Sequence, residues 1–325
     1  ALAQAGFDSV QVVEAQATPD PDFSTVKSPN PESQAAFALA EDLGRQVGAD
    51  VLVATDPDAD RVGVEVLQKD GSYLNLSGNQ IGAIMAKYIL EAHKNAGTLP
   101  ENAALCKSIV STDLVTKIAE SYGATMFNVL TGFKFIAEKI QEFEEKHNHT
   151  YMMGFEESFG YLIKPFVRDK DAIQAVLVVA ELAAYYRSRG LTLADGIEEI
   201  YKEYGYYAEK TISVTLSGVD GAEQIKAIMA KFRENGPKEW NATPITVVED
   251  FKAQTSTAAD GTVTALTTPP SDVLKYTLAD GSWIAVRPSG TEPKIKFYIA
   301  VVGESNEDSQ AKIANIEAEI NAFVK

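Results

Sequence analysis

The first two hundred residues alternate short apolar runs with longer amphipathic segments, and this alternation limits the possible folds more than any other feature. Short runs rich in β-branched residues predict strands at residues 9–13, 51–54, 62–67, 105–110, 124–129 and 151–154. Segments with a helical apolar period predict helices at residues 32–47, 78–92, 113–122, 133–146, 170–188 and 192–203. Strands that alternate with helices are typical of α/β domains with open sheets.

From about residue 207 the pattern changes to longer β regions with few helices. It predicts strands at residues 211–216 and 294–301, several short β segments over 244–286, and helices at 221–234 and 306–324. A chain of 325 residues exceeds one ordinary domain. We therefore expect two α/β domains, residues 1–103 and 104–206, followed by a smaller α+β domain over residues 207–325.

Charge and cysteine content exclude several classes of function. The chain has 29 Lys and Arg against 46 Asp and Glu, a net charge of −17, so it repels nucleic acids. No apolar run approaches the roughly 18 residues of a membrane span, so no membrane partner is expected. The only cysteine, Cys106, can form no intrachain disulfide and favours a cytoplasmic location. Its apolar neighbours predict a small buried side chain.

An acidic loop, Asp56-Pro57-Asp58-Ala59-Asp60-Arg61, follows directly after a predicted apolar strand. Carboxylates at alternate positions of a curled loop converge on one point, where their repulsion requires a cation. Oxygen ligands suit Mg²⁺ or Mn²⁺. The sequence therefore predicts a metal site at a strand end, with a solvated acidic turn as the alternative.

Two other loop types share part of this pattern. An EF-hand requires Gly and Glu where this chain has Arg61 and Leu67, so it is excluded. The nucleophile loop of a dehalogenase-type phosphatase also begins with Asp-x-Asp but normally continues with x-Thr or x-Val, where this chain has Asp60. That reading, with Asp56 as the nucleophile, is kept as an alternative.

A basic cluster stands between two predicted strands of the last domain. It combines a guanidinium, two hydroxyls, a glycine and two lysines: Arg287, Ser289, Gly290, Thr291, Lys294 and Lys296. Glycine lets successive N–H groups point into one concavity, and arginine clamps phosphate with two parallel hydrogen bonds. This pattern predicts an anion site, with a polar hairpin as the alternative.

Two further clusters lie in the second predicted domain. Residues 154–160 contain Glu156, Glu157 and Ser158, which suit vicinal sugar hydroxyls but also fit a helix-start turn. Residues 168–171 place Arg168 and Lys170 at a helix N-terminus, which suits phosphate or a general acid. The three histidines of the chain form no ligand set.

Together and in this order, these segments resemble the α-D-phosphohexomutase family over nearly the whole chain. The matching segments are the acidic loop at 56–61, Thr131-Gly132, the sugar loop at 154–160, residues 168–171 and the phosphate loop at 287–291. The resemblance implies a four-domain protein, with three related α/β domains and a smaller α+β domain like the TATA-binding protein. This chain corresponds to domains two to four, and its first domain lacks a strand and part of a helix.

The family's phosphoserine loop, of the form Ser/Thr-x-Ser-His-Asn-Pro, belongs to its first domain. No Ser-His pair occurs in this sequence. The segment Ser28-Pro29-Asn30-Pro31 has proline where the family has histidine, and it is interpreted as a rigid turn. We therefore expect a fragment that lacks the phosphoserine domain and shows no turnover by itself.

The resemblance also implies a role for each matching residue. Asp56, Asp58 and Asp60 would hold Mg²⁺, and Arg61 would offset developing charge during phosphoryl transfer. The proposed proton-transfer or phosphate-contact residue is Lys170. The substrate-binding residues would be Thr131, Gly132, Lys134, Glu156, Ser158, Arg168, Arg287, Ser289, Gly290, Thr291 and Lys296.

The implied reaction interconverts glucose 1-phosphate and glucose 6-phosphate through a phosphoserine enzyme and glucose 1,6-bisphosphate. The absence of histidine directly after Glu156-Glu157-Ser158 argues against the phosphoglucosamine branch of the family. Mannose phosphates stay open as substrates, as does a sugar-phosphate-binding module without catalysis.

Overall fold

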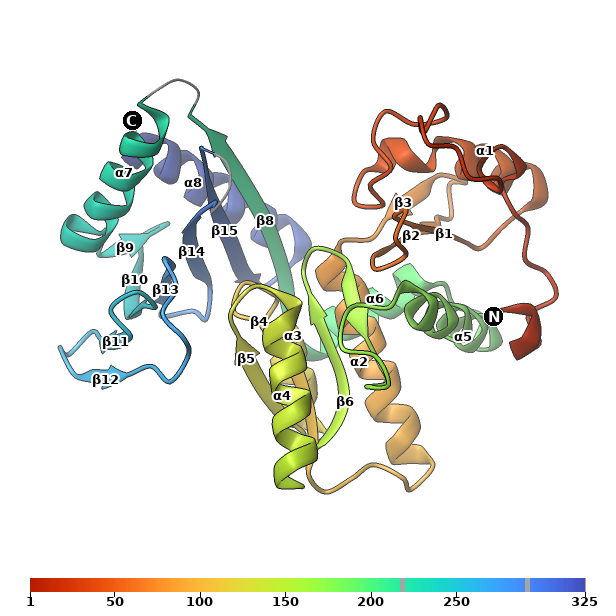
Figure 1. Ribbon diagram of the computed structural model, residues 1–325, viewed down its shortest axis with the longest axis horizontal. Coiled ribbons are helices and arrows are strands. Elements are labelled where there is room, and N and C mark those ends of the chain that lie inside the picture. Colours follow the sequence, from red (N-terminus) through yellow and green to blue (C-terminus); the bar gives the residue numbers. More distant parts are fainter. Residues whose placement is uncertain (217–219, 290–292, 325) are drawn as a thin grey trace. The chain divides into compact units, whose positions relative to one another are not determined.

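The computed structural model describes residues 1–216, 220–289 and 293–324. The chain divides into two compact units, residues 1–204 and residues 205–325 (Figure 1). The first unit holds two small sheets with their helices, and the second holds one larger sheet with two helices. The fold class is therefore mixed α/β with a separate C-terminal domain, as the alternation of strands and helices predicts.

The first sheet is antiparallel, in the order β1 (Val51–Thr55), β2 (Val62–Leu67), β3 (Tyr73–Asn75). Helix α1 (Ala38–Val47) lies on one face of it, where Phe37, Leu52 and Tyr73 form a small apolar cluster. The acidic loop joins β1 to β2, so the pairing of these two strands holds both ends of the loop.

The N-terminal segment differs from its prediction. Residues 9–13 form no strand, so that prediction is wrong. Val10 and Val12 are 46% and 58% exposed, which leaves the segment without a buried face to hold it against a sheet. The helix expected from residue 32 begins at Ala38, after a 3₁₀ turn over Gln34–Phe37. Alternating valines favour extended chain, but a strand also requires a partner.

The second sheet has the order β5 (Thr125–Val129), β4 (Ala103–Ser108), β6 (Thr150–Glu156), β7 (Gly160–Leu162). The first three strands are parallel, and β7 returns antiparallel to β6. Helix α4 (Phe133–Lys146) packs Ile136 and Ile140 against Ala104 and Cys106 on one face. Parallel strands end at a common edge, so the loops after β4, β5 and β6 gather there.

Four more helices complete the first unit: α2 (Gly78–Asn95), α3 (Leu114–Ser121), α5 (Ala172–Ser188) and α6 (Leu193–Tyr204). Helix α2 packs against β6 and α3, although the predicted boundary at residue 103 assigns it to the first domain. That boundary stays a prediction. Helix α5 contacts β7 of the second sheet and also β1 and β2 of the first. It therefore links the two sheets beside the acidic loop.

The second unit is built on an antiparallel sheet in the order β12-β11-β10-β13-β14-β15-β8, with β9 paired to β10. Its strands are β8 (Tyr206–Thr215), β9 (Glu239–Trp240), β10 (Thr243–Asp250), β11 (Thr255–Ala258), β12 (Val263–Ala265), β13 (Leu274–Leu278), β14 (Trp283–Pro288) and β15 (Lys294–Gly303). Helices α7 (Gly221–Asn235) and α8 (Asn306–Val324) share one apolar core with this sheet. Phe232 and Ile316 are among its buried residues.

Two further expectations can be compared with the described residues. Cys106 is completely buried in β4, as predicted, and burial raises the pKa of its thiol to about 12. Among the described residues, no helix combines the length and the apolar character that crossing a bilayer requires.

One carboxyl group is buried inside the first sheet. Glu65 of β2 is fully buried, and Asn75 of β3 donates a hydrogen bond to its Oε1 at 3.2 Å. Burial raises the pKa of Glu65 to about 7; the Asn75 hydrogen bond opposes this rise, and the nearby Glu41 adds to it. The protonated carboxyl is therefore the form that favours folding.

This burial predicts a stability change across neutral pH. The contribution of Glu65 is fully present below its ordinary pKa of 4.5 and is lost as the pH rises through about 7. We expect the Tm of the chain to fall more between pH 6 and pH 8 than the Tm of the Glu65→Gln variant. The exposed Glu14→Gln variant should keep the wild-type slope in the same melting experiment. Equal slopes for wild type and Glu65→Gln would contradict the prediction.

Candidate active site

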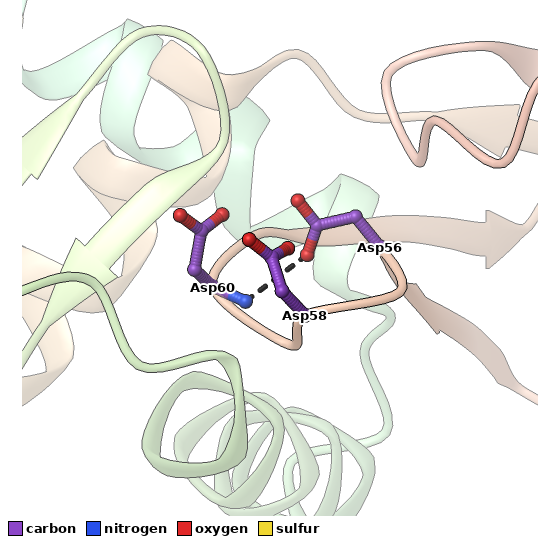
Figure 2. A group of neighbouring side chains, drawn as sticks. All are labelled: Asp56, Asp58 and Asp60. Carbon is purple, nitrogen blue, oxygen red and sulfur yellow. Dashed lines mark hydrogen bonds between the residues drawn. The ribbon is translucent and has the colours of Figure 1, made fainter.

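The acidic loop curls so that its three carboxylates lie together. Figure 2 shows Asp56, Asp58 and Asp60 pointing to the same side of the loop, and one oxygen from each lies within 4.8 Å of the others. The loop is closed from inside, because Asp56 Oδ1 accepts hydrogen bonds from the N–H groups of Asp60 at 3.0 Å and Arg61 at 2.9 Å. Ala59 has a φ of 56°, a strained value for a residue other than glycine.

The electrostatics of this loop fit a divalent cation. Burial raises the pKa of Asp56, and the neighbouring Asp60 and Asp58 raise it further against the opposing backbone hydrogen bond from Arg61. Asp60 Oδ1 is buried and has no hydrogen-bond partner among the described residues. Three crowded carboxylate oxygens are the donor set that Mg²⁺ prefers. The residues present therefore fit the metal that the sequence predicts.

The loop is bonded directly to the second sheet and its helix. The N–H of Val62 donates to the carbonyl of Phe159 at 3.1 Å, and the N–H of Ala172 donates to the carbonyl of Ala59 at 3.0 Å. Arg61 also forms an isolated β-bridge with Gly160. The predicted metal loop and the predicted sugar loop are thus held together by backbone hydrogen bonds.

Lys170 lies between the two loops. Its Nζ is 2.9 Å from Asp60 Oδ2 and 2.8 Å from Asp169 Oδ1. Burial alone would lower the pKa of Lys170, but the hydrogen bonds to Asp169 and Asp60 outweigh it and raise the pKa. A Cβ at Gly160 would come within 2.2 Å of Lys170 Cδ, so only glycine leaves room for this side chain. Lys170 is held here as a cation.

Arg61 pairs with three carboxylates. Its Nη1 is 2.9 Å from Glu32 Oε1, and its Nε is 3.8 Å from Asp56 Oδ2 and 3.6 Å from Asp60 Oδ1. The side chain is 37% exposed, so its guanidinium can still reach an anion that approaches from solvent. Sequence reasoning did not identify Glu32, because its partner lies 29 positions away.

The predicted sugar loop is joined to the loop after β5. Glu156 ends β6 and is almost completely buried, and its Oε1 accepts a hydrogen bond from the N–H of Gly132 at 2.6 Å. Gly132 has a φ of 123°, which a side chain would strain. Beside it, Thr131 Oγ1 is buried without a hydrogen-bond partner among the described residues. Ser158 is half-buried in the same turn as Glu156.

The side chains of two further predicted residues of this unit contact other groups. Arg168 pairs with Glu144 and donates to the carbonyl of Pro165. Glu144 is near the far end of α4, about 18 Å along the helix from Gly132 at a rise of 1.5 Å per residue. Lys134 is exposed, with its Nζ 4.8 Å from the centre of the Phe135 ring. Binding roles for Arg168 and Lys134 stay predictions.

The predicted phosphate loop belongs to the second unit. Arg287 of β14 stands directly opposite Lys296 of β15, and the N–H of Ser289 donates to the carbonyl of Lys294 at 2.7 Å. Residues directly opposite each other in antiparallel strands share a face, so two cations lie side by side, and their repulsion would be relieved by an anion. The other two predicted residues, Gly290 and Thr291, lie outside the described residues.

Comparison with known proteins decides the family. Phosphoglucomutase/phosphomannomutase family models match three successive parts of the chain: alpha/beta/alpha domain II at residues 1–69, alpha/beta/alpha domain III at residues 77–204 and the C-terminal domain at residues 219–322. The chain belongs to the α-D-phosphohexomutase family. A dehalogenase-type phosphatase with Asp56 as nucleophile is therefore no longer a competing interpretation.

Relatives within this family are similar along almost the whole chain. The phosphoglucomutase of Staphylococcus aureus (strain bovine RF122 / ET3-1) is 39% identical over 313 residues, which cover 96% of this chain and 55% of the relative. That of Staphylococcus haemolyticus is 38% identical over 315 residues, covering 97% of this chain and 56% of the relative. The chain thus spans about half the length of the curated relatives it matches.

A solved structure has the same fold. The open form of the phosphoglucomutase parafusin from Paramecium superposes with a TM-score of 0.62 at 18% identity. The superposition covers 94% of this chain and 51% of that one. At this identity the similarity concerns the fold alone.

Several polar residues beneath the sugar loop were not among the predicted site residues. Lys107, Ser108 and Ser111 have completely buried side chains at the end of β4 and in the loop that follows it. A lysine inside the apolar run of a predicted strand was the one available signal, because a buried charge requires a partner. Its partner here is Asp113, whose Oδ1 lies 2.9 Å from Lys107 Nζ.

The acidic loop predicts a measurable metal affinity. Asp58 is the most exposed of the three aspartates, so Asp58→Asn should disturb the loop least while removing one ligand charge. We expect its affinity for Mg²⁺ or Mn²⁺, measured by isothermal titration calorimetry, to fall by at least about tenfold. Without metal, the same change should raise the Tm slightly, because it removes a like charge.

The matched control is Asp70→Asn, which neutralises an exposed aspartate in the turn between β2 and β3. This variant should bind the metal as the wild type does. Equal metal affinities for Asp58→Asn and the wild type would show that the loop is a solvated acidic turn.

Proposed function

We propose that this chain supplies the metal-binding, sugar-binding and phosphate-binding parts of a phosphoglucomutase, which interconverts glucose 1-phosphate and glucose 6-phosphate. Curated phosphoglucomutases that are 38–39% identical to it support the choice of glucose phosphates. The phosphoryl donor would be a phosphoserine of the family's first domain, and glucose 1,6-bisphosphate would be the intermediate.

One observation carries the proposal more than any other. The ion pair of Asp60 with Lys170 joins the carboxylates of the acidic loop to a cation beside the sugar loop, at 2.9 Å. Phosphoryl transfer requires little covalent chemistry from the protein and depends mainly on positioning and charge stabilisation. A carboxylate cluster fixed next to two cations, Lys170 and Arg61, meets that requirement.

Each group has a distinct task in this proposal. Bound Mg²⁺ would neutralise charge on the transferring phosphoryl oxygens and would be held by Asp56, Asp58 and Asp60. Arg61 and Lys170 would add positive charge around the same phosphoryl group. Lys170 would remain protonated beside its two aspartates, so we assign it to phosphate contact rather than to proton transfer.

Two sets of residues would each contact a different part of the substrate. Glu156 and Ser158 would bind the hydroxyls in the middle of the sugar, which occupy similar positions when the hexose is turned around. Arg287, Ser289 and Lys296, together with Gly290 and Thr291, would bind the phosphate that is not reacting. The two half-reactions require that these residues accept glucose 1,6-bisphosphate in either orientation.

Two finer points belong to the same proposal. The sequence has no Ser-His pair and thus no phosphoserine loop of the family's form, so we expect the 325-residue chain to bind hexose phosphates without interconverting them. The single buried cysteine supports a cytoplasmic setting for the reaction. Mannose phosphates are the second candidate substrates, because the family model covers both mutases.

Sugar binding can be tested on the chain itself. Glu156→Gln keeps an oxygen for the N–H of Gly132 but removes the charge that would accept hydrogen bonds from sugar hydroxyls. We expect the affinity for glucose 6-phosphate in the presence of Mg²⁺ to fall about tenfold, or about 1.4 kcal/mol. Calorimetric titration of wild type and variant measures this difference.

The control is Glu138→Gln, which changes an exposed residue of α4, the helix that follows Gly132. It should bind as the wild type does. If the wild type binds mannose 6-phosphate as tightly as glucose 6-phosphate, the broader specificity, for both sugar phosphates, is assigned. If the wild type binds neither sugar phosphate more tightly than inorganic phosphate, the proposed function is refuted. If the pure chain converts glucose 1-phosphate, the need for a separate phosphoserine is refuted.

A further inference from the structure

Two buried serines and the partly buried Glu157 form a hydrogen-bonded cluster at the sugar loop. Ser108 is the last residue of β4, and Ser111 lies in the loop between β4 and α3. Both serines are completely buried. Their common partner is Glu157, which follows Glu156 in the turn between β6 and β7. We call Ser108, Ser111 and Glu157 the serine clamp.

The clamp holds Glu157 through both its side chain and its backbone. Glu157 Oε2 is 3.0 Å from Ser108 Oγ and 3.2 Å from Ser111 Oγ. The two hydroxyls are 2.8 Å apart, and the N–H of Glu157 donates to Ser111 Oγ at 3.0 Å. Moving this carboxylate would take an acceptor away from two buried hydroxyls, so these contacts hold it in position.

The loop that carries Ser111 is itself anchored. Lys107 is completely buried, and its Nζ donates to the carbonyl of Ser111 at 3.1 Å while pairing with Asp113 at 2.9 Å. From α2, the side chain of Asn79 accepts a hydrogen bond from the N–H of Thr112 at 3.0 Å. The serines therefore stand on a rigid support rather than on a free surface loop.

The clamp lies next to the residues that would contact the sugar. Glu157 stands between Glu156 and Ser158, so fixing its backbone fixes the direction of both neighbours. Phe159 follows with a φ of 66°, a conformation that a residue other than glycine keeps only when its surroundings impose it. The carboxylate of Glu157 contacts the serines, whereas that of Glu156 contacts the N–H of Gly132.

We infer that Ser108 and Ser111, acting through Glu157, are positioning residues for sugar recognition. They orient Glu156 and Ser158 so that the site distinguishes a hexose phosphate from phosphate alone. The inference rests on the proposed function, since it requires that Glu156 and Ser158 bind sugar. It differs from that function in naming three residues that touch neither the sugar nor the metal.

The test compares selectivity rather than affinity alone. In the Ser108→Ala, Ser111→Ala double variant, we expect the preference for glucose 6-phosphate over inorganic phosphate to fall about tenfold. The affinity for Mg²⁺ should stay within about twofold of wild type, because the acidic loop keeps its own hydrogen bonds. A merely structural role would weaken all three affinities together. Calorimetry with each ligand separately measures the three values.

Two further variants keep the test decisive if the double variant folds poorly. Ser111→Thr retains the hydroxyl and should keep most of the selectivity. Glu157→Gln retains an oxygen for the serines but loses the charge, and should lie between wild type and the double variant. The control Ser121→Ala removes a hydroxyl that donates to the carbonyl of Ile118 at 2.8 Å in α3, and should leave selectivity unchanged.

The possible failures are separable. If the wild type itself shows no preference for glucose 6-phosphate, the proposed function fails. If the wild type is selective and both the double variant and Glu157→Gln are equally selective, the proposed function stands and the serine clamp is refuted. A parallel loss of Mg²⁺ affinity would also refute it, since the cluster would then support the fold as a whole.

Discussion

The ion pair between Asp60 and Lys170 is the contact on which the arrangement of the first unit's site depends. The two side chains are only 26% and 14% exposed, so both charges have lost much of their water. A pair of this kind is costly to break, because the remaining partner would be left as an uncompensated charge. Backbone hydrogen bonds from Val62 to Phe159 and from Ala172 to Ala59 flank it. Residues far apart in the sequence are thereby kept in one constellation.

Both units also place like charges side by side. The three aspartates of the acidic loop crowd their oxygens within 4.8 Å, and Arg287 stands opposite Lys296 on neighbouring strands. Like charges at this spacing repel in each arrangement, and Lys170 and Arg61 offset part of this repulsion at the acidic loop. Each becomes favourable when a ligand of opposite charge binds. The chain has a net charge of −17, so an anionic sugar phosphate would bind only where cations are gathered locally, as at Arg287 and Lys296 or at a metal held by the aspartates.

The sequence predicted the features that depend on neighbouring residues. The helices at 133–146 and 306–324 were predicted at their observed bounds, because long apolar periods are strong local signals. The three aspartates were identified because alternate residues of one loop converge without help from elsewhere. The strand at 9–13 was wrongly predicted, since alternating valines carry no information about a pairing partner.

The sequence could not predict contacts between distant segments. The pairing of Arg61 with Glu32 and the clamp on Glu157 each join residues from separate elements. Ser108 falls within the strand predicted at 105–110 and Ser111 just after it, and only their burial and contacts in the structure show that they hold Glu157. Arg168 illustrates the opposite case: its position in a motif favoured the site, whereas its side chain pairs with Glu144.

The central claim is that the acidic loop is a metal site placed beside the sugar loop. A crystal of this chain grown with Mn²⁺ and glucose 1,6-bisphosphate tests it most directly, through the anomalous scattering of manganese. The account predicts one anomalous peak about 2.1 Å from carboxylate oxygens of Asp56, Asp58 and Asp60. It further predicts sugar hydroxyls within hydrogen-bond distance of Glu156. A manganese peak at other carboxylates, or a sugar bound away from Glu156, would contradict it.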